Sequence, residues 1–291
     1  RQLMNQVIFG CGDVGRRIAR LLTSDGVSRD AIVAYVRTSA SAEVCSRLGV
    51  MALRVDLDHL QRGLSPCHGS QLYYTVAPPK HGTQDLRTEA LLAALTRDQV
   101  RPSKAVVIST TGVYGDCDGD WVTEQTPANP STERGQRRLD MEQRWLSWGH
   151  KMRVLVVILR VPGIYAYSRL PRERIKAGTP VVKRDECGYT NRIHADDLAR
   201  VCIAAMQHGK RGEIYNVTDG QPGSITEYLQ AAAHVLGHDP LPEISMQEAQ
   251  QRLSAGMLSY LSESRKISNQ KMLTELGVEL KYPDFMQGIK Y

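Results

Sequence analysis

The stretch that decides the fold lies near the start of the chain and reads Val7-Ile8-Phe9-Gly10-Cys11-Gly12-Asp13-Val14-Gly15. Its first three residues are apolar and of the types that strands favour, so they predict a short buried strand. After the turn, apolar residues recur at helical spacing, at Val14, Ile18, Leu21 and Leu22. A strand therefore passes through a glycine-rich turn directly into a helix.

The spacing of the three glycines has a physical reason in such a turn. Gly10 permits the tight bend, Gly12 lets a ligand approach the backbone, and Gly15 allows the helix to pack closely on the strand. Free N–H groups and the positive dipole at the helix start favour phosphate. We therefore predict that the pyrophosphate of a dinucleotide is held by Gly10, Cys11, Gly12, Asp13, Val14 and Gly15. The alternative is a turn with only a structural role.

Apolar strands alternate with helices from this turn onward. Further strands are predicted at residues 31–36, 51–55, 72–76, 104–109 and 153–161, and helices at 42–48, 83–98 and 132–147. Continuous apolar strands separated by helices indicate a parallel sheet covered on both faces. Because crossovers between parallel strands are right-handed, the sheet is expected to be doubly wound. The sequence predicts an α/β fold of the Rossmann type.

Beyond Pro162 the alternation weakens, and this predicts a second, smaller unit. A helix at 198–206 and a strand at 213–217 continue the sheet pattern, whereas the remainder is mainly helical, at 225–236, 247–253 and 269–276. We predict a dinucleotide-binding domain over residues 1–165, to which 190–220 return. Residues 166–189 and 221–291 are then expected to form a small, mainly helical substrate lobe.

Composition indicates an ordinary globular protein. The 291 residues are 42% hydrophobic and 23% charged, which argues against disorder and coiled coils. No apolar run approaches the roughly 18 residues that span a membrane, and residues 1–6 lack the apolar core of a signal peptide. The six cysteines form no CxxC pair, as is typical of reduced thiols. We predict a cytoplasmic protein without a membrane partner.

Charge and histidine spacing exclude two further classes of site. The net charge of +6 allows an anionic ligand, but the lysines and arginines are scattered rather than gathered with aromatic residues, so we predict no nucleic-acid partner. His234 and His238 have helical i, i+4 spacing but lack the acidic residue and the third ligand of a zinc motif. We predict no metal site.

The end of the second predicted strand bears on the choice of coenzyme. An acidic residue at this position would bind the 2′-hydroxyl of the adenosine ribose. This chain has Arg37-Thr38-Ser39 there, and a guanidinium with hydroxyls suits a 2′-phosphate. We therefore predict NADP, with NAD as the alternative. Arg37 as an ordinary solvated charge is the other interpretation.

Five motifs together resemble a known family. They are Gly10 to Gly15, Asp56-Leu57, Ser109-Thr110-Thr111-Gly112-Val113-Tyr114-Gly115, Val161-Pro162-Gly163-Ile164-Tyr165 and Asn191-Arg192-Ile193-His194-Ala195-Asp196-Asp197. Their order resembles that of extended short-chain dehydrogenases/reductases, the group that includes NAD-dependent epimerases and dehydratases. The resemblance covers essentially the whole chain, and it also allows a homodimer, which is common in that family.

The resemblance implies roles for the matched positions. Asp56 and Leu57 would hold the adenine, and Ala77 and Pro78 would pass near its ribose. Further members of the implied site are Ser109 and Thr110 at the central strand, with Thr110 as the catalytic hydroxyl, and Pro162 and Gly163 at the nicotinamide.

The chain departs from the family where the family carries its Tyr-x-x-x-Lys pair. Alignment on Glu142 places Arg134 at the tyrosine and Arg138 at the lysine. Arginine stays protonated in proteins, so Arg134 cannot be a general base. Arg138 could still hold the ribose and an anion, and Tyr114 is a candidate acid or base if a cation such as Arg138 lowers its pKa. A packed or substrate-lining aromatic is the alternative for Tyr114, and a solvated surface is the alternative for the two arginines.

Two classes of function follow. The first is an NAD(P)-dependent oxidoreductase, or an epimerase/dehydratase-like enzyme, that transfers hydride to or from a small polar substrate. The net positive charge of the chain allows this substrate to carry an anionic group. Thr110, Tyr114 and Arg138 would be its catalytic residues. The second is a non-catalytic protein that binds the coenzyme as a redox sensor or scaffold, and the absent Tyr-x-x-x-Lys pair favours it.

Overall fold

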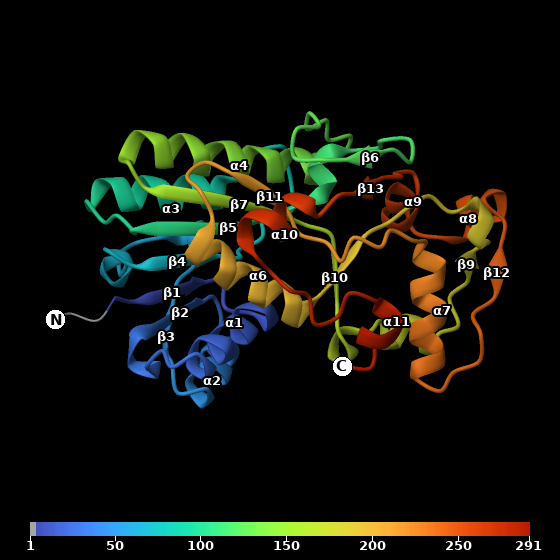
Figure 1. The fold of residues 1–291 in the computed structure, drawn as a ribbon, viewed down its shortest axis with the longest axis horizontal. Coiled ribbons are helices and arrows are strands. Elements are labelled where there is room, and N and C mark those ends of the chain that lie inside the picture. The colour runs from blue at the N-terminus through green and yellow to red at the C-terminus, as the bar shows by residue number, and fades with distance from the viewer. Residues whose placement is uncertain (1–3) are drawn as a thin grey trace.

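The computed structural model describes residues 4–291, and its centre is a seven-stranded sheet (Figure 1). The strands are β1 (Gln6–Phe9), β2 (Ile32–Val36), β3 (Met51–Arg54), β4 (Gln71–Tyr74), β5 (Lys104–Thr110), β7 (Leu155–Val161) and β11 (Ile214–Asn216). They are ordered β11-β7-β5-β4-β1-β2-β3, and every neighbouring pair is parallel. The predicted doubly wound Rossmann sheet is confirmed. Residues 1–3, part of the segment predicted not to be a signal peptide, lie outside the described residues.

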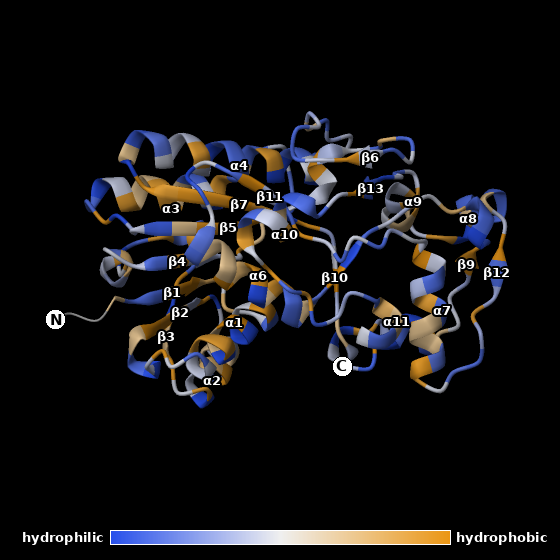
Figure 2. Cartoon of the chain, viewed as in Figure 1, coloured by the Kyte–Doolittle hydropathy of each residue, from blue (hydrophilic) through white to orange (hydrophobic). Residues whose placement is uncertain are grey.

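Helices bury both faces of the sheet. One face is covered by α1 (Asp13–Ser24), α2 (Ser39–Arg47), α6 (Ala195–His208) and α10 (Gln270–Leu276). The other face is covered by α3 (Leu86–Arg97) and α4 (Glu133–Met152), which contribute Leu91, Leu95 and Trp145 to the core. Because both faces are covered, the central strands are apolar along their length. Figure 2 shows this for β7, in which Arg160 is the one charged residue.

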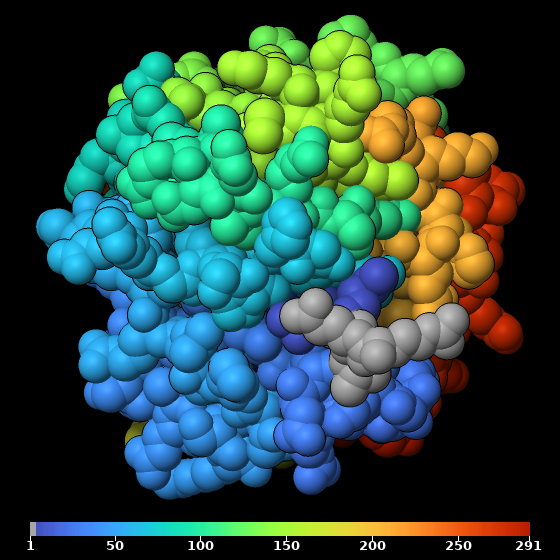
Figure 3. Space-filling model, turned by 90° about the vertical axis from the view of Figure 1, so that its left-hand side faces the viewer, coloured from blue at the N-terminus to red at the C-terminus, as the bar shows by residue number. Residues whose placement is uncertain are grey.

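The chain beyond the sheet forms a lobe at the carboxyl ends of the strands (Figure 1). Its elements are β6 (Trp121–Val122), β8 (Gly163–Tyr165), α5 (Arg172–Lys176), β9 (Val181–Val182), β10 (Arg192–His194), α7 (Ile225–Val235), β12 (Glu243–Ile244), α8 (Met246–Arg252), α9 (Ala255–Leu261), β13 (Lys266–Ile267) and α11 (Phe285–Gly288). A core of its own includes Leu170, Ile175, Val181 and Leu229. Seen from the opposite end, the surface consists mostly of the first half of the chain (Figure 3).

The lobe and the sheet are not separated cleanly along the sequence. Helix α10 comes from the segment that the sequence assigns to the lobe, yet Met272 and Leu276 pack in the core between the sheet and α6. The predicted boundaries at residues 165, 190 and 220 remain a prediction.

His194 is the N-cap residue of α6. Its Nδ1 accepts a hydrogen bond from the amide of Asp196 at 3.0 Å, so the ring caps the helix. Its Nε2 lies 3.2 Å from the carbonyl oxygen of Tyr291. Burial lowers the pKa of His194, which favours the neutral ring that this capping bond requires. Over residues 4–291, no helix combines the length and the apolarity needed to cross a membrane.

Candidate functional site

Two cavities open at the carboxyl ends of the strands. The glycine-loop cavity has a volume of about 240 Å³ and lies where β1, β2, β3 and β4 end. The lobe cavity has a volume of about 350 Å³ and lies between the end of β5, the start of α4 and the lobe. Ligands in open α/β sheets bind at this edge. Together the two cavities contain many of the predicted site residues, although not all of them.

Each glycine of the turn has a distinct environment. Gly10 has a φ of +88°, and a Cβ there would lie 2.8 Å from Cγ2 of Val76. A Cβ on Gly15 would lie 2.9 Å from Cγ2 of Ile8, so the helix could not pack as closely on β1. A Cβ on Gly12 would meet no atom within 4 Å. Gly10 and Gly15 are therefore required by the packing of the protein, whereas the absence of a side chain at Gly12 leaves free space for a ligand.

The turn fits a pyrophosphate. No side chain caps the start of α1, where Gly12 is the N-cap residue, so the first-turn amides have no side-chain acceptor. The amides of Gly10 and Cys11 both donate to the carbonyl oxygen of Tyr35, at 3.0 and 3.1 Å, which holds the turn in place. An uncapped helix start beside an exposed backbone surface favours the binding of an anion.

The other predicted residues of the turn face away from the open surface. The Cys11 side chain is buried in the core, and Val14 packs against the same core. Asp13 forms ion pairs with Arg17 at 3.1 Å and with Arg169 at 3.0 Å. Burial opposes the charge of Asp13, but these two arginines more than offset it and the pKa of Asp13 is lowered. Cys11, Asp13 and Val14 would therefore offer a ligand backbone rather than side chains.

The glycine-loop cavity gathers predicted coenzyme residues from four strand ends. It is lined by Gly10, Arg37, Asp56, Leu57 and Ala77, together with Arg87, which the sequence did not indicate. Arg87 is fixed by Asp58, with Nε donating at 2.9 Å, and it also donates to the carbonyl oxygen of Ala77 at 3.1 Å. Arg37 is exposed and forms no ion pair with any residue of the described chain.

Two predicted residues lie just outside this lining. Thr38 caps α2, because its Oγ1 accepts a hydrogen bond from the amide of Ser41 at 3.1 Å. Pro78 follows Ala77, and its carbonyl oxygen accepts a long hydrogen bond of 3.5 Å from Arg87. Both residues directly follow a lining residue in the sequence, but neither lines the cavity itself.

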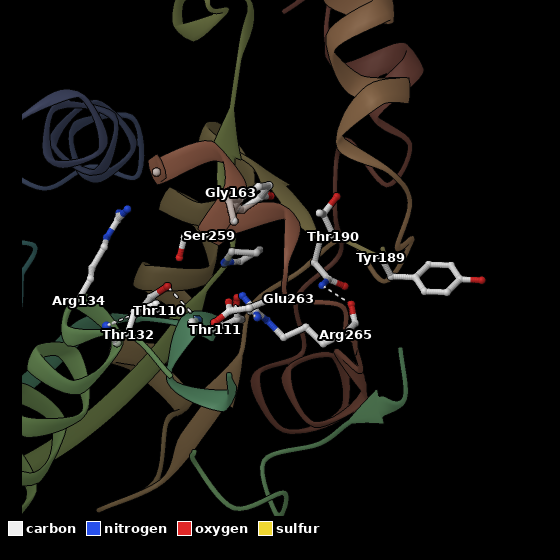
Figure 4. Close-up of a pocket in the computed structure, with 16 residues that line it drawn as sticks. Thr110, Thr111, Thr132, Arg134, Gly163, Tyr189, Thr190, Ser259, Glu263 and Arg265 are labelled. Atoms are coloured by element: carbon white, nitrogen blue, oxygen red, sulfur yellow. Dashed lines mark hydrogen bonds and ion pairs between the residues drawn. The ribbon is translucent and has the colours of Figure 1, made fainter. Parts of the chain in front are cut away.

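The lobe cavity gathers Thr110, Pro162 and Gly163 with Arg134 (Figure 4). Thr110 is the last residue of β5, and its Oγ1 accepts a hydrogen bond from the amide of Gly112 at 3.1 Å. Its hydroxyl hydrogen therefore remains free to donate. Arg134 lies in the first turn of α4, in the position that the resemblance gives to the family's tyrosine.

Arg138 and Ser109 lie behind the lobe cavity instead of lining it. Arg138 donates to the carbonyl oxygen of Ile108 at 3.2 Å, and burial followed by the nearby Arg134 lowers the pKa of its guanidinium. The hydroxyl of Ser109 donates to Glu142. Glu142 also forms a buried ion pair with Arg160 at 2.8 Å. The Ser109 hydroxyl therefore serves the core, and the role of Ser109 in binding the coenzyme remains a prediction.

The predicted acid–base role of Tyr114 needs correction as well. Tyr114 is 1% exposed and its hydroxyl donates to Oδ1 of Asn216 at 2.7 Å. The cation over its ring is Arg160, at 4.8 Å, rather than Arg138. Burial raises the pKa of Tyr114 although Arg160 opposes this effect. A buried phenol with a raised pKa has the packing role that was the alternative.

The lobe supplies cavity residues to which the sequence assigned no role. They are Tyr189, Thr190, Asn191, Ser259, Tyr260, Glu263 and Arg265. Figure 4 shows the ring of Tyr189 pointing away from the cavity. Tyr260 belongs to α9, and it is 39% exposed. Asn191 opens a motif that carries the resemblance, and this motif was the available signal.

Known proteins share the fold of this chain. The model of the NAD dependent epimerase/dehydratase family matches residues 84–218. A functionally unknown conserved protein from Silicibacter pomeroyi has a similar structure, with a TM-score of 0.83, 29% identity, and coverage of 98% of this chain and 96% of that one. The NAD complex of dTDP-glucose 4,6-dehydratase from Bacillus anthracis shares the fold, with a TM-score of 0.75, 16% identity, and coverage of 99% and 94%.

Two curated relatives match over shorter segments. Protein YeeZ of Escherichia coli is 29% identical over 185 residues, which are 63% of this chain and 60% of YeeZ. The 3-diazoavenalumate denitrifying reductase of a Streptomyces species is 27% identical over 116 residues, which are 40% of this chain and 38% of the reductase. The matched regions thus span less than two thirds of these relatives. Over residues 84–218 the chain is therefore similar to the NAD-dependent epimerase/dehydratase family, in which NAD or NADP is the typical coenzyme.

Proposed function

We propose that the protein is an NADPH-dependent reductase of a carbonyl group on a small polar molecule. The observation that carries this proposal is the position of the two cavities on one sheet edge. Gly10 and Arg37 line the glycine-loop cavity, the uncapped start of α1 follows Gly10 in the chain, and the lobe cavity has the free hydroxyl of Thr110. One relative is by name a reductase, which also supports the direction of the reaction.

The preference for NADPH is supported by the charges around the glycine-loop cavity. Arg37 follows β2 and lines the cavity, and it has no carboxylate partner within the described residues. The acidic residue that lines it, Asp56, already accepts a hydrogen bond from the amide of Asp58 at 2.9 Å. Arg37 attracts Asp56 and Asp58 without forming an ion pair with either, and a 2′-phosphate would give it a charge-assisted hydrogen-bonding partner.

Reduction of a carbonyl group, rather than oxidation of a hydroxyl group, is supported by the proton-donating side chains that line the lobe cavity. When bound, the coenzyme would supply a hydride to the carbonyl carbon. The Thr110 hydroxyl can donate a hydrogen bond to the carbonyl oxygen, which then needs one proton to become a hydroxyl. Tyr260 lines the same cavity, it is 39% exposed where Tyr114 is buried, and its phenol is protonated at neutral pH, so it is the candidate donor.

A coenzyme sensor without turnover is the second candidate function. The position of the family's tyrosine is occupied by Arg134, and Tyr114 is buried. Neither residue can move a proton at the lobe cavity in the way that the family's tyrosine does.

Thermal-shift titration with NADPH, NADP, NADH and NAD tests the coenzyme. We expect a larger stabilisation by the 2′-phosphorylated forms, and we expect Arg37→Asp to reduce their affinity by about tenfold to a hundredfold. Arg211→Gln, which removes an exposed charge from the turn before β11, is the matched control. Equal shifts by all four coenzymes in both proteins would contradict the NADPH preference.

Oxidation of NADPH against a panel of small aldehydes and ketones tests the reaction. We expect turnover that falls by about a hundredfold in Tyr260→Phe, in keeping with the loss of a positioned proton donor. Tyr114→Phe should lower stability without a comparable loss of rate per folded molecule. Tight coenzyme binding with no turnover on any carbonyl compound would favour the sensor.

A further inference from the structure

We propose that Arg134 is the residue that selects the substrate, and that it does so by binding a carboxylate group. The proposal rests on the proposed function, because it concerns the same lobe cavity, and it names the chemical class of the substrate. Its basis is the balance of charge in that cavity.

The lobe cavity contains one positive charge that no residue compensates. Its charged lining residues are Arg134, Glu263 and Arg265. Glu263 and Arg265 form an ion pair at 2.8 Å, with side chains that are each 12% exposed, and Ser131 donates to Glu263 at 2.8 Å. Figure 4 shows this pair on one side of the cavity and Arg134 on the other. Arg134 has no ion pair or side-chain hydrogen bond within the described residues.

A second guanidinium adds to the positive potential. Arg138 lies one helical turn after Arg134, and the proximity of Arg134 contributes to the lowered pKa of Arg138. The carboxylates of Asp85 and Glu142 partly offset the charge of Arg138, so Arg134 is left as the uncompensated charge. Asp85 accepts hydrogen bonds from the amides of Arg87 and Thr88, both at 3.1 Å, and Glu142 pairs with Arg160. An anion from outside the chain would relieve the repulsion between the two arginines.

The size and the donors of the cavity point to a small monoanion. Its volume of about 350 Å³ lies at the lower end of the range for ligand pockets. Besides Arg134, it offers hydroxyl groups on Thr110, Thr132 and Ser259. Thr132 Oγ1 accepts a hydrogen bond from the amide of Gly135 at 3.0 Å, so its hydrogen is free to donate. One uncompensated charge matches a carboxylate, whereas a phosphate dianion would leave a surplus of negative charge.

Paired probes that differ only in charge test the proposal. Benzoate and benzamide have nearly the same shape, and inorganic phosphate represents the dianion. Each is titrated against the protein with and without saturating NADP, with the thermal shift and the dissociation constant as readouts. The variants are Arg134→Gln, Arg134→Lys and the control Arg211→Gln. Arg134 is exposed, so its replacement should leave the melting temperature of the free protein unchanged.

We expect benzoate to bind at least tenfold more tightly than benzamide. Arg134→Gln should weaken benzoate by about tenfold to a hundredfold and leave benzamide unchanged, since one charge-assisted contact is lost. Arg134→Lys should keep part of the affinity, and Arg211→Gln all of it. Equal binding of benzoate and benzamide, an equal loss in Arg211→Gln, or tighter binding of phosphate than of benzoate would overturn the proposal. Failure of NADP to bind would instead overturn the proposed function, because the benzoate titration without coenzyme still tests Arg134.

Discussion

The two cavities lie on the same sheet edge but are assembled from very different parts of the chain. The lining of the glycine-loop cavity comes almost wholly from residues at the ends of four parallel strands, such as Gly10 after β1 and Arg37 after β2. The lobe cavity combines a strand end, a helix start and the separate helix α9. A cavity made by a regular sheet is fixed by the fold itself. A cavity shared between the sheet and a lobe depends on how the two are held together.

The buried ion pair behind the lobe cavity gives the largest expected effect. Glu142→Leu would leave Arg160, which is 4% exposed, without its partner, and we expect a loss of about 3–5 kcal/mol of unfolding free energy. Glu248→Gln, which breaks the exposed pair with Arg252, should cost less than about 1 kcal/mol. Urea denaturation of both variants measures the difference. Similar midpoints would show that the pair does not hold this end of the sheet together.

The junction between β11 and the lobe should respond to pH. Burial raises the pKa of Asp219 to about 7, above the usual value near 4 for an aspartate, so the folded protein favours the protonated form. Stability from this group is therefore full below about pH 4 and is lost as the pH rises towards 7. At pH 8, Asp219→Asn should increase the free energy of unfolding by roughly 2–4 kcal/mol and raise the melting temperature accordingly. Near pH 4 it should leave both quantities unchanged. An equal change at both pH values would contradict this.

Substitutions of Gly12 and Gly10 should distinguish an effect on coenzyme binding from an effect on stability. In Gly12→Ala the new Cβ would meet no protein atom within 4 Å, so we expect unchanged stability. We also expect at least a hundredfold loss of coenzyme affinity, because the new methyl group would fill the space that the phosphate needs. Gly10→Ala should lose stability as well, by about 1–3 kcal/mol, because of its positive φ and the contact with Val76. Thermal melts with and without NADP distinguish the two outcomes. Full coenzyme binding by Gly12→Ala would show that the turn has only a structural role.

The difference between the cavities also explains what the sequence could predict. The sheet and most of the glycine-loop cavity follow from contiguous motifs, since a residue that follows a parallel strand must lie at the binding edge. Helix α9 was not expected, because Gly256 and its flanking serines are typical of turns, and yet it carries Tyr260. The burial of Tyr114 could not be read from its place in a loop. It depends on Asn216 and Arg160, which are distant in the sequence and meet Tyr114 only in the folded chain.

The carbonyl oxygen of Tyr35 has a wider consequence. It accepts two successive amides of the glycine turn, and it belongs to the strand that ends beside Arg37. The diphosphate and the adenosine ends of a dinucleotide would therefore meet a single preorganised frame rather than two loops that must first be ordered. Association should then lose little conformational entropy in the protein, and the affinity should reside in contacts that exist before the ligand arrives.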